Sequence, residues 1–150
     1  MSKYDSLKIE NQLCFPLYAA AKEVVRQYKP FLDRVGLTYT QYITMMILWE
    51  AHDKFPSGSV NVKTLGARLF LDSGTLTPLL KKLEIKGIIE RSRSSEDERN
   101  VLVQATEKGM LLREQCISIP QSVGSCIPLT PEESATLYGL LHKILGSASV

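Results

Sequence analysis

The three cysteines of this sequence carry the side chains with the most distinctive chemistry. Cys14, Cys116 and Cys126 lie far apart, and neither a Cys-x-x-Cys pair nor a Cys/His cluster is present. This spacing argues against a zinc site, and a reducing compartment would disfavour a permanent disulfide. We therefore expect no metal and no cofactor, and the default expectation for each lone thiol is burial as a small hydrophobic side chain.

Cys14 differs from the other two because it lies at the predicted start of a helix covering roughly residues 13–32. Pro16 fits the first turn of that helix, where its missing N–H costs no hydrogen bond. The helix macrodipole and the unpaired N–H groups at this end favour a negatively charged sulfur, which is the reactive form of cysteine. At the other end we expect Pro30 to bend or end the helix, with residues 33–36 as its exit.

The segment from Leu71 to Gly87 is predicted to form an amphipathic helix with a polar face suited to nucleic acid. Its apolar residues repeat at helical spacing along one stripe: Leu76, Leu79, Leu80 and Leu83. The opposite face carries hydroxyl and ammonium groups: Ser73, Thr75, Thr77, Lys81 and Lys82. Such groups donate hydrogen bonds to phosphates and base edges. An ordinary solvated helix face has the same composition, so this helix alone does not decide between the two interpretations.

Two sites compete as the start of this helix. Thr77-Pro78 combines a capping residue with a proline in the first turn. Asp72 and Ser73 are also good caps, and a start there would place Pro78 inside the helix at the cost of a hydrogen bond. We favour the earlier start, with a local distortion, and we expect Gly87 to end the helix.

Two further helices precede this segment. Thr38 begins the first of them, which over residues 42–50 is apolar on nearly all sides, so we expect it to be the most buried helix. Residues 63–71 predict a short helix, and the break at residues 72–74 makes the pair a helix-turn-helix. The inward-facing residues of the short helix are Leu65, Leu69 and Phe70.

A hairpin is predicted after the amphipathic helix. Its two short strands cover residues 88–93 and 101–103, and the polar turn between them carries Arg99 near its tip. Residues 60–62 could add a third strand. A helix followed by a hairpin with an arginine near its tip is the arrangement of a winged helix-turn-helix.

The C-terminal part of the chain is predicted to be helical in two segments. One helix opens at Thr106, and Pro120 interrupts the helical pattern. Thr130-Pro131 begins the last helix with a capping residue followed by a first-turn proline. The last helix carries the apolar stripe Leu137, Leu140, Leu141, Ile144 and Leu145. We expect it to end at Gly146 and residues 147–150 to fray.

These elements predict one domain over residues 1–150, mainly α-helical with a small β wing. A winged-helix core covers about residues 36–105, and dimerisation helices over about residues 8–35 and 106–146 flank it. The small core offers the flanking helices no obvious place, so their apolar stripes are best buried against a second copy. A two-fold homodimer would also present two helices to half-sites about one turn of DNA apart.

Charge and hydropathy limit the classes of partner. The net charge is only +2 over 150 residues, so any affinity for nucleic acid must come from local clusters of Lys and Arg. No apolar run is long enough to span a bilayer, and the N-terminal residues lack the apolar core of a signal peptide. We therefore expect no membrane partner and a cytoplasmic location.

Several segments match a known family of regulators: Asn11–Phe15, Tyr28–Pro30, Gly36–Tyr42, Leu71–Lys81 and Glu96–Arg99. Through them the chain resembles, over nearly its whole length, the MarR family of winged-helix repressors. More specifically it resembles the OhrR group, which senses organic hydroperoxides. The Asp-x-Arg motif of the wing is typical of the whole family. The Leu-Asp-Ser-Gly-Thr-Leu-Thr-Pro run together with an early Leu-Cys-Phe is specific within it.

The resemblance implies how the chain would bind a double-stranded, pseudo-palindromic operator. The helix from Ser73 would enter the major groove, and Arg99 would enter the minor groove, whose narrow and strongly negative form suits a guanidinium. Asp97 would orient Arg99 and would not itself contact DNA. The candidate contacts to groove edges and phosphates are Ser73, Thr75, Thr77 and Lys81, with Arg91 and Arg93 as candidate contacts to the DNA backbone.

The resemblance also makes Cys14 the sensing, or peroxidatic, thiol. Tyrosines matching Tyr28 and Tyr39 hydrogen-bond this sulfur in the family, and Tyr18 lies close to it. Tyr28 follows Cys14 by about 20 Å along a straight helix, so it cannot reach the thiol of its own chain. Any such contact should therefore come from the other subunit.

The late cysteines indicate the two-Cys branch of the group, in which a second thiol closes a disulfide with the oxidised one. Cys126 lies in the connection before Pro131, near where that branch carries its resolving cysteine, and Cys116 is the runner-up. The expected function is a repressor that releases its operator when an organic hydroperoxide, acting as the inducer, oxidises Cys14.

Two alternatives remain open. A MarR-type repressor could respond to a phenolic or lipophilic ligand at the subunit interface, with Cys14 incidental. A thiol peroxidase could turn over at Cys14. A peroxidase has no need of the Arg99 wing, so we expect the protein not to be an enzyme.

Overall fold

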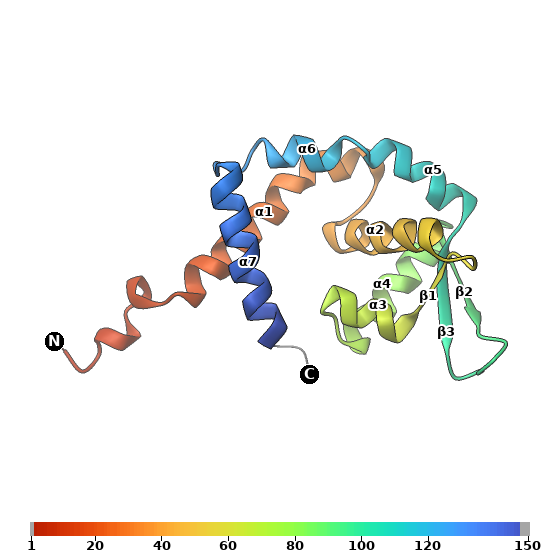
Figure 1. Cartoon of the computed structure of the whole chain (residues 1–150), viewed down its shortest axis with the longest axis horizontal. Coiled ribbons are helices and arrows are strands. Elements are labelled where there is room, and N and C mark those ends of the chain that lie inside the picture. Colours follow the sequence, from red (N-terminus) through yellow and green to blue (C-terminus); the bar gives the residue numbers. More distant parts are fainter. Residues whose placement is uncertain (1, 148–150) are drawn as a thin grey trace. The chain divides into compact units, whose positions relative to one another are not determined.

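The computed structural model describes residues 2–147 of the 150-residue chain. The chain divides into two compact units, one ending at Ile119 and the other beginning at Pro120. It is mostly helical with one three-stranded antiparallel sheet, which confirms the predicted fold class (Figure 1). Two short 3-10 helices, η1 (Asp5–Leu7) and η2 (Ile9–Asn11), precede the first α-helix. Within the described residues, none of the helices has the length and apolar character needed to cross a membrane.

Helix α1 (Cys14–Val35) is longer than predicted, because Pro30 neither ends nor interrupts it. Proline has no N–H, so the carbonyl of Arg26 loses its partner in the helix. Both residues are exposed, so water can bond to that carbonyl. The helix ends where Gly36 adopts a left-handed conformation with φ +69°, and Leu37 N–H then donates to the Leu32 carbonyl at 3.1 Å.

Helix α2 (Tyr39–Lys54) forms the centre of the first unit, as its apolar composition predicted. Thr38 and Gln41 form a reciprocal capping box at its start. Its buried residues are Gln41, Tyr42, Thr44, Met45, Ile47, Leu48, Trp49 and Ala51. More residues are buried in α2 than in any other described helix, which confirms that prediction.

Helices α3 (Val62–Leu69) and α4 (Ser73–Ile85) form the helix-turn-helix. Asp72 caps α4 by accepting the N–H of Thr75 at 2.8 Å, so the earlier of the two predicted starts is correct. Pro78 therefore lies inside α4. Gly87, at φ +72°, follows the end of the helix as predicted.

The prediction that Phe70 faces inward is wrong, although Leu65 and Leu69 are buried as expected. Phe70 is the C-cap of α3 and adopts a left-handed conformation with φ +54°. This conformation ends the helical repeat, so the side chain no longer lies on the buried face, and Phe70 is 59% exposed.

The sheet has the strand order β1-β3-β2, with β1 (Ser59–Asn61), β2 (Ile89–Arg93) and β3 (Val101–Ala105). Val103 is fully buried at its centre, opposite Val60 on one side and Arg91 on the other. The predicted third strand is therefore present. The turn between β2 and β3 forms the wing that extends beyond the helices (Figure 1).

Helix α5 (Glu107–Cys116) ends before Pro120, as predicted. A short helix that the sequence did not predict, α6 (Ile119–Gly124), follows it and carries Pro120 in its first turn. Helix α7 (Pro131–Ser147) begins with a reciprocal bond between Thr130 and Glu133. It extends one residue beyond the predicted end, and the rest of the predicted frayed segment lies outside the described residues.

Gly109 is the position in the first unit where a side chain would be least tolerated. An added Cβ would lie 2.1 Å from the Ile88 carbonyl oxygen, which is backbone and cannot move aside. The Gly109 carbonyl also accepts the indole N–H of Trp49 at 2.9 Å. We expect Gly109→Ala to lower the free energy of unfolding by about 3 kcal/mol or more, because α5 must move away from the sheet.

Urea denaturation followed by circular dichroism measures this effect. Gly124→Ala is the matched control, because an added Cβ there meets nothing within 4 Å. Equal stability of the two variants would contradict the close packing of α5 on the strand that begins after Ile88.

Candidate functional site

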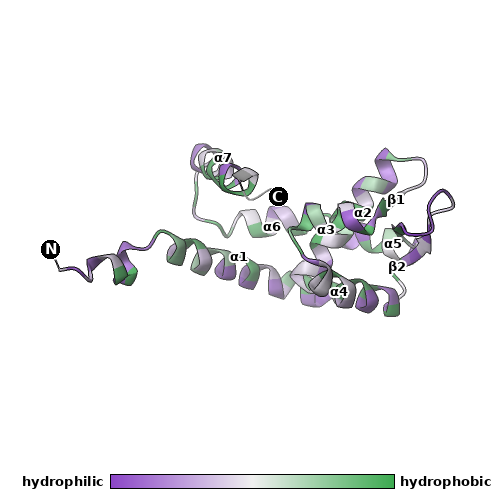
Figure 2. Ribbon diagram, turned by 90° about the horizontal axis from the view of Figure 1, so that it is seen from below, coloured by the Kyte–Doolittle hydropathy of each residue, from purple (hydrophilic) through white to green (hydrophobic). Residues whose placement is uncertain are grey.

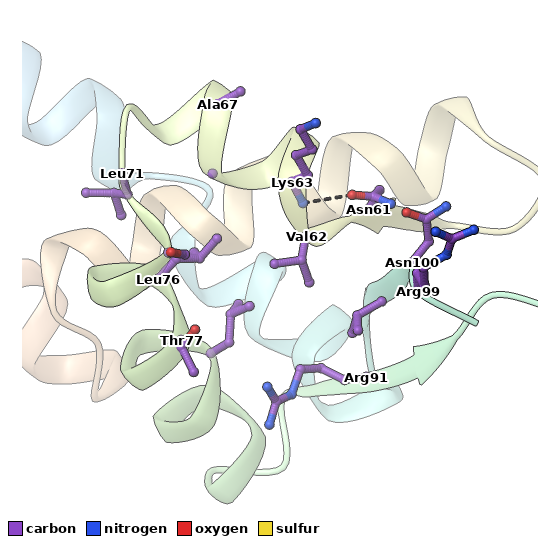
Figure 3. Close-up of a pocket in the computed structure, with 14 residues that line it drawn as sticks. Asn61, Val62, Lys63, Ala67, Leu71, Leu76, Thr77, Arg91, Arg99 and Asn100 are labelled. Carbon is purple, nitrogen blue, oxygen red and sulfur yellow. Dashed lines mark hydrogen bonds between the residues drawn. The ribbon is translucent and has the colours of Figure 1, made fainter. Parts of the chain in front are cut away.

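Helices α3 and α4 and the wing surround one groove on the first unit (Figure 3). The cavity along the groove has a volume of about 510 Å³. Four of the predicted DNA contacts line it: Ser73, Thr77, Arg91 and Arg99. The remaining three, Thr75, Lys81 and Arg93, are exposed outside it.

The polar face of α4 is free for contacts because its apolar stripe is buried. Leu76, Leu80 and Leu83 are each at most 2% exposed. The hydroxyl and ammonium groups predicted as contacts all lie on the exposed side of the helix: Ser73, Thr75, Thr77 and Lys81. Burial of one face therefore holds the other outward on a rigid element.

The turn of the wing holds Arg99 outward through Asp97. The Asp97 carboxylate accepts the backbone N–H of Arg99 at 3.0 Å and lies 3.5 Å from its guanidinium Nε. The side chain of Arg99 is nevertheless 94% exposed. Arg93 closes the turn from the other side by donating to the Glu98 carbonyl at 2.8 Å.

Arg91 has a partner inside the chain that the sequence did not reveal. Its guanidinium pairs with Glu84 of α4 at 2.7 Å and so links the helix to the wing. Lys63, Asn61 and Asn100 also line the groove without having been predicted (Figure 3). In the sequence, the only sign of this role was their position: Asn61 and Lys63 lie at the start of the helix-turn-helix, and Asn100 lies in the turn of the wing.

Cys14 is the first residue of α1 and is exposed. Leu13 before it makes no side-chain capping bond, and Pro16 lies in the first turn as predicted. Every residue from Asn11 to Glu23 is exposed, so this half of α1 contributes no buried side chain to the core of the first unit.

The default expectation of three buried cysteines is wrong for two of them. Cys14 and Cys126 are exposed, and Cys116 alone is buried, at 3% exposure. Both exposed thiols lie at the ends of short or unpacked segments, where no core forms around them. Cys126 follows α6, and its Sγ lies 3.4 Å from the Ser122 carbonyl.

We expect the three thiols to differ in their reaction with iodoacetamide. Burial raises the pKa of the Cys116 thiol, so both access and thiolate formation are restricted there. In the native protein Cys116 should react on the order of tenfold more slowly than Cys126, because it must wait for local opening. Peptide mass spectrometry gives the rates, and all three should react equally in denaturant. Equal native rates would contradict the burial of Cys116.

Tyr28 and Tyr39 come together in a cluster that also contains Tyr42. Their ring centroids are 4.9 Å apart, and those of Tyr28 and Tyr42 are 5.8 Å apart. Burial raises the pKa of Tyr28 and Tyr39 and raises the pKa of Tyr42 to about 12. At neutral pH these hydroxyls therefore keep their protons and can donate hydrogen bonds.

The structure does not bring Cys14 to this cluster within one chain. Cys14 and Tyr28 lie on the same unbroken helix α1, which separates them by about 20 Å. Tyr18, one turn after Cys14, is the predicted tyrosine that shares its part of the helix, and it is 62% exposed.

Apolar residues occur along α1 and, in the second unit, along α7 (Figure 2), and several of their side chains are exposed. On α1 they are Phe15, Leu17, Tyr18 and Val25, and on α7 they are Leu137, Tyr138, Leu140 and Ile144. Several exposed apolar side chains on one helix are typical of a surface that contacts another molecule.

The chain is similar to known regulators over most of its length. The family model described as transcriptional regulator SarA/Rot matches residues 26–115. The organic hydroperoxide resistance transcriptional regulator of Bacillus subtilis is 45% identical over 144 residues, covering 96% of this chain and 94% of that protein. The HTH-type regulator SarZ of Staphylococcus epidermidis is 44% identical, covering 91% of this chain and 88% of that protein.

Solved structures with the same fold include complexes with DNA. Overoxidized AbfR bound to DNA superposes with a TM-score of 0.74 at 29% identity, covering 98% of this chain and 99% of that one. AbfR comes from Staphylococcus epidermidis. A mutant of MarR from E. coli complexed with operator DNA has a TM-score of 0.77 at 27% identity, covering 97% and 99%.

Proposed function

Because this chain belongs to the MarR-type winged-helix transcriptional regulators, we propose that it is a repressor that organic hydroperoxides release from its operator by oxidising Cys14. The observation that carries the proposal is the position of Cys14, an exposed thiol at the uncapped start of α1. The name of the Bacillus subtilis relative supports the choice of organic hydroperoxides as inducer.

The DNA-binding surface is formed by the polar face of α4 and the wing. Ser73, Thr75 and Thr77 lie on the exposed face that would enter the major groove, with Lys81 one turn further along. Arg99 would enter the minor groove, held by Asp97. Arg91 and Arg93 would contact the DNA backbone. Arg91 would also keep helix and wing together through Glu84.

A homodimer supplies what one chain lacks. The exposed apolar residues of α1 and α7 need a partner to cover them, and a second copy of the chain offers the same surfaces. Two copies related by a two-fold axis would present two α4 helices to the half-sites of a pseudo-palindromic operator. They would also allow Tyr28 and Tyr39 of one chain to approach Cys14 of the other.

The sensing reaction is a thiol oxidation that balances without a cofactor. The Cys14 thiolate attacks the terminal oxygen of the hydroperoxide, the O–O bond breaks, and the alkoxide leaves. Cys14 becomes a sulfenic acid, and the alkoxide takes a proton from solvent or from a nearby hydroxyl to become the alcohol. Tyr28 and Tyr39, protonated at neutral pH, have hydroxyls that can donate to the thiolate and to the departing oxygen.

Cys126 is our choice as the resolving thiol, because it is exposed and Cys116 is buried. Its thiol would attack the sulfenic sulfur of the other subunit, forming a disulfide and releasing water. Such a bond would displace the helices at the interface, so the two α4 helices would no longer match the half-sites.

A gel-shift assay on the DNA upstream of the protein's own gene tests the proposal. The reduced protein should shift this DNA, and tert-butyl hydroperoxide should abolish the shift, whereas tert-butanol, the reduced product, should have no effect. Mass spectrometry of the oxidised protein should show a Cys14–Cys126 link between chains. Binding that persists under hydroperoxide would overturn the sensing role, and a Cys14–Cys116 link would reassign the resolving residue.

A further inference from the structure

Lys86 lies where the ends of four helices of the first unit meet. It is the C-cap of α4, and its ammonium group reaches across to the end of α1 and the start of α2. There Lys86 Nζ donates to the Gly36 carbonyl and, at 2.8 Å, to the side-chain oxygen of Gln41. One side chain therefore joins the end of α4 to the connection between α1 and α2.

The acceptors of Lys86 are held rigidly. Gln41 is 4% exposed, and the same oxygen accepts the backbone N–H of Thr38 at 3.2 Å as part of the capping box. Gly36 is the left-handed residue that ends α1. The ammonium group therefore contacts a backbone carbonyl at the end of α1 and a buried side chain that caps the start of α2.

The start of α5 holds the same segment from the other side. Lys108 donates to the Lys86 carbonyl at 2.9 Å, and the Thr106 hydroxyl donates to the Gly87 carbonyl at 2.7 Å. Residues 86 and 87, which connect α4 to the wing, are thus fixed between α1–α2 and α5. The α4 helix can change its direction relative to α1 only if these polar contacts change.

A cavity beside this junction makes the polar contacts more important. It has a volume of about 390 Å³ and lies between Val35, Leu37, Ile88 and Leu111. The apolar side chains of α1 and of the segment after α4 leave this space unfilled. Besides the buried side chains of Leu37 and Ile88, the ammonium group of Lys86 therefore links the two segments at this point.

We propose that Lys86 is a positioning residue that couples the direction of α1 to that of α4. Cys14 lies at the other end of α1, so any displacement that its oxidation imposes on the helix would reach α4 through this contact. The inference rests on the proposed sensing function. It adds a route by which α1, a continuous helix with the thiol at one end and Gly36 at the other, acts on the DNA-binding surface.

The test compares operator affinity, measured by fluorescence anisotropy, between the reduced protein and the protein oxidised with tert-butyl hydroperoxide. Allosteric coupling typically changes affinity by about 5- to 150-fold. In Lys86→Met we expect the reduced and the oxidised protein to differ in operator affinity by less than about threefold, because oxidation no longer redirects α4. Lys86→Arg should keep the wild-type ratio, since a guanidinium can donate to both acceptors.

Lys54→Met is the matched control, because it removes one positive charge whose partner, Glu50, lies on its own helix. Peptide mass spectrometry of Cys14 must show equal oxidation in all variants.

If Lys86→Met loses affinity but keeps the wild-type ratio of reduced to oxidised affinity, Lys86 is only structural and the inference fails. If Lys86→Met does not fold, Lys86→Gln, which keeps an N–H donor, replaces it and should show a partly reduced ratio. An unchanged ratio there overturns the inference.

The control with wild-type protein separates this inference from the proposed function. If oxidation does not change the operator affinity of the wild-type protein, the sensing function itself fails, whatever the variants do. If it does change that affinity and Lys86→Met responds equally, the sensing function stands and the coupling role of Lys86 is wrong.

Discussion

Cys14→Ser should bind operator DNA like the wild-type protein and should no longer be released by an organic hydroperoxide. The thiol is exposed at the start of α1, so the smaller hydroxyl disturbs no packing, and stability should change by less than about 0.5 kcal/mol. Serine cannot form a sulfenic acid, so the first bond of the sensing reaction cannot form. A gel shift across a series of tert-butyl hydroperoxide concentrations measures the result.

Two control variants make this prediction specific. Cys116→Ser should respond like the wild-type protein, because Cys116 is buried and takes no part in the proposed reaction. Cys126→Ser should still be oxidised at Cys14 but should form no link between chains. Normal release of Cys14→Ser would instead favour a repressor that responds to a phenolic or lipophilic ligand.

Arg99→Ala should weaken operator binding strongly without weakening the fold. A single arginine contact to DNA is worth about 1–3 kcal/mol, which is roughly a 5- to 150-fold change in affinity at each wing. The Arg99 side chain is 94% exposed and its neighbour Asp97 holds the backbone of the turn, so the hairpin should remain intact. Fluorescence anisotropy at fixed salt gives the affinities, and the salt dependence should become shallower.

The control for charge is Arg113→Ala. Arg113 pairs with Asp53 between α5 and α2, away from the groove, and its removal takes the same charge from the protein. Asp97→Asn should also weaken binding, but less than Arg99→Ala does. The asparagine oxygen can still accept the backbone N–H of Arg99, but it no longer carries the negative charge that faces the guanidinium. Equal affinities of Arg99→Ala and the wild-type protein would remove the wing from the DNA-binding surface.

The helix-turn-helix and the wing could be predicted because local chemistry and hydrophobic periodicity agree there. The stripe of leucines in α4 predicted its buried face, and the cap at Asp72 competed successfully with Thr77-Pro78. Leu80 and Leu83 would lie in the helix with either start, but Leu76, which is 2% exposed, joins the buried stripe only if the helix begins at the earlier site. The burial of Leu76 and the cap at Asp72 together therefore outweigh the one hydrogen bond that Pro78 removes.

The errors arose where distant or absent neighbours decide the outcome. Pro30 stays within α1 because the carbonyl that loses its partner is exposed to water, which no local rule reveals. Phe70 is exposed because its own left-handed conformation ends α3 at Leu69, two residues earlier than predicted. The pairing of Arg91 with Glu84 depends on how α4 and β2 meet in space, and their spacing in sequence gives no sign of it.

The candidate redox site could be predicted only in part for a related reason. A helix start with Pro16 in its first turn predicted the place of Cys14, and the resemblance to a known family supplied its tyrosines. Tyr42 was missed because it was assigned to the core, where it does lie, although its ring also contacts Tyr28. The exposure of Cys14 could not be predicted, because free cysteines are usually buried.

The separation of Cys14 from Tyr28 along one rigid helix has a consequence for mixtures of chains. If each sensing site takes its thiol from one copy and its tyrosines from the other, a pair of chains holds two such sites. Neither chain then supplies all the residues of either site. A copy without the thiol, paired with a copy without the tyrosines, would then contain one complete site and one site lacking both parts. Two inactive genes could in this way restore a response that neither gives alone. In a cell that carries one defective and one intact gene, every mixed pair would keep one complete site of the two.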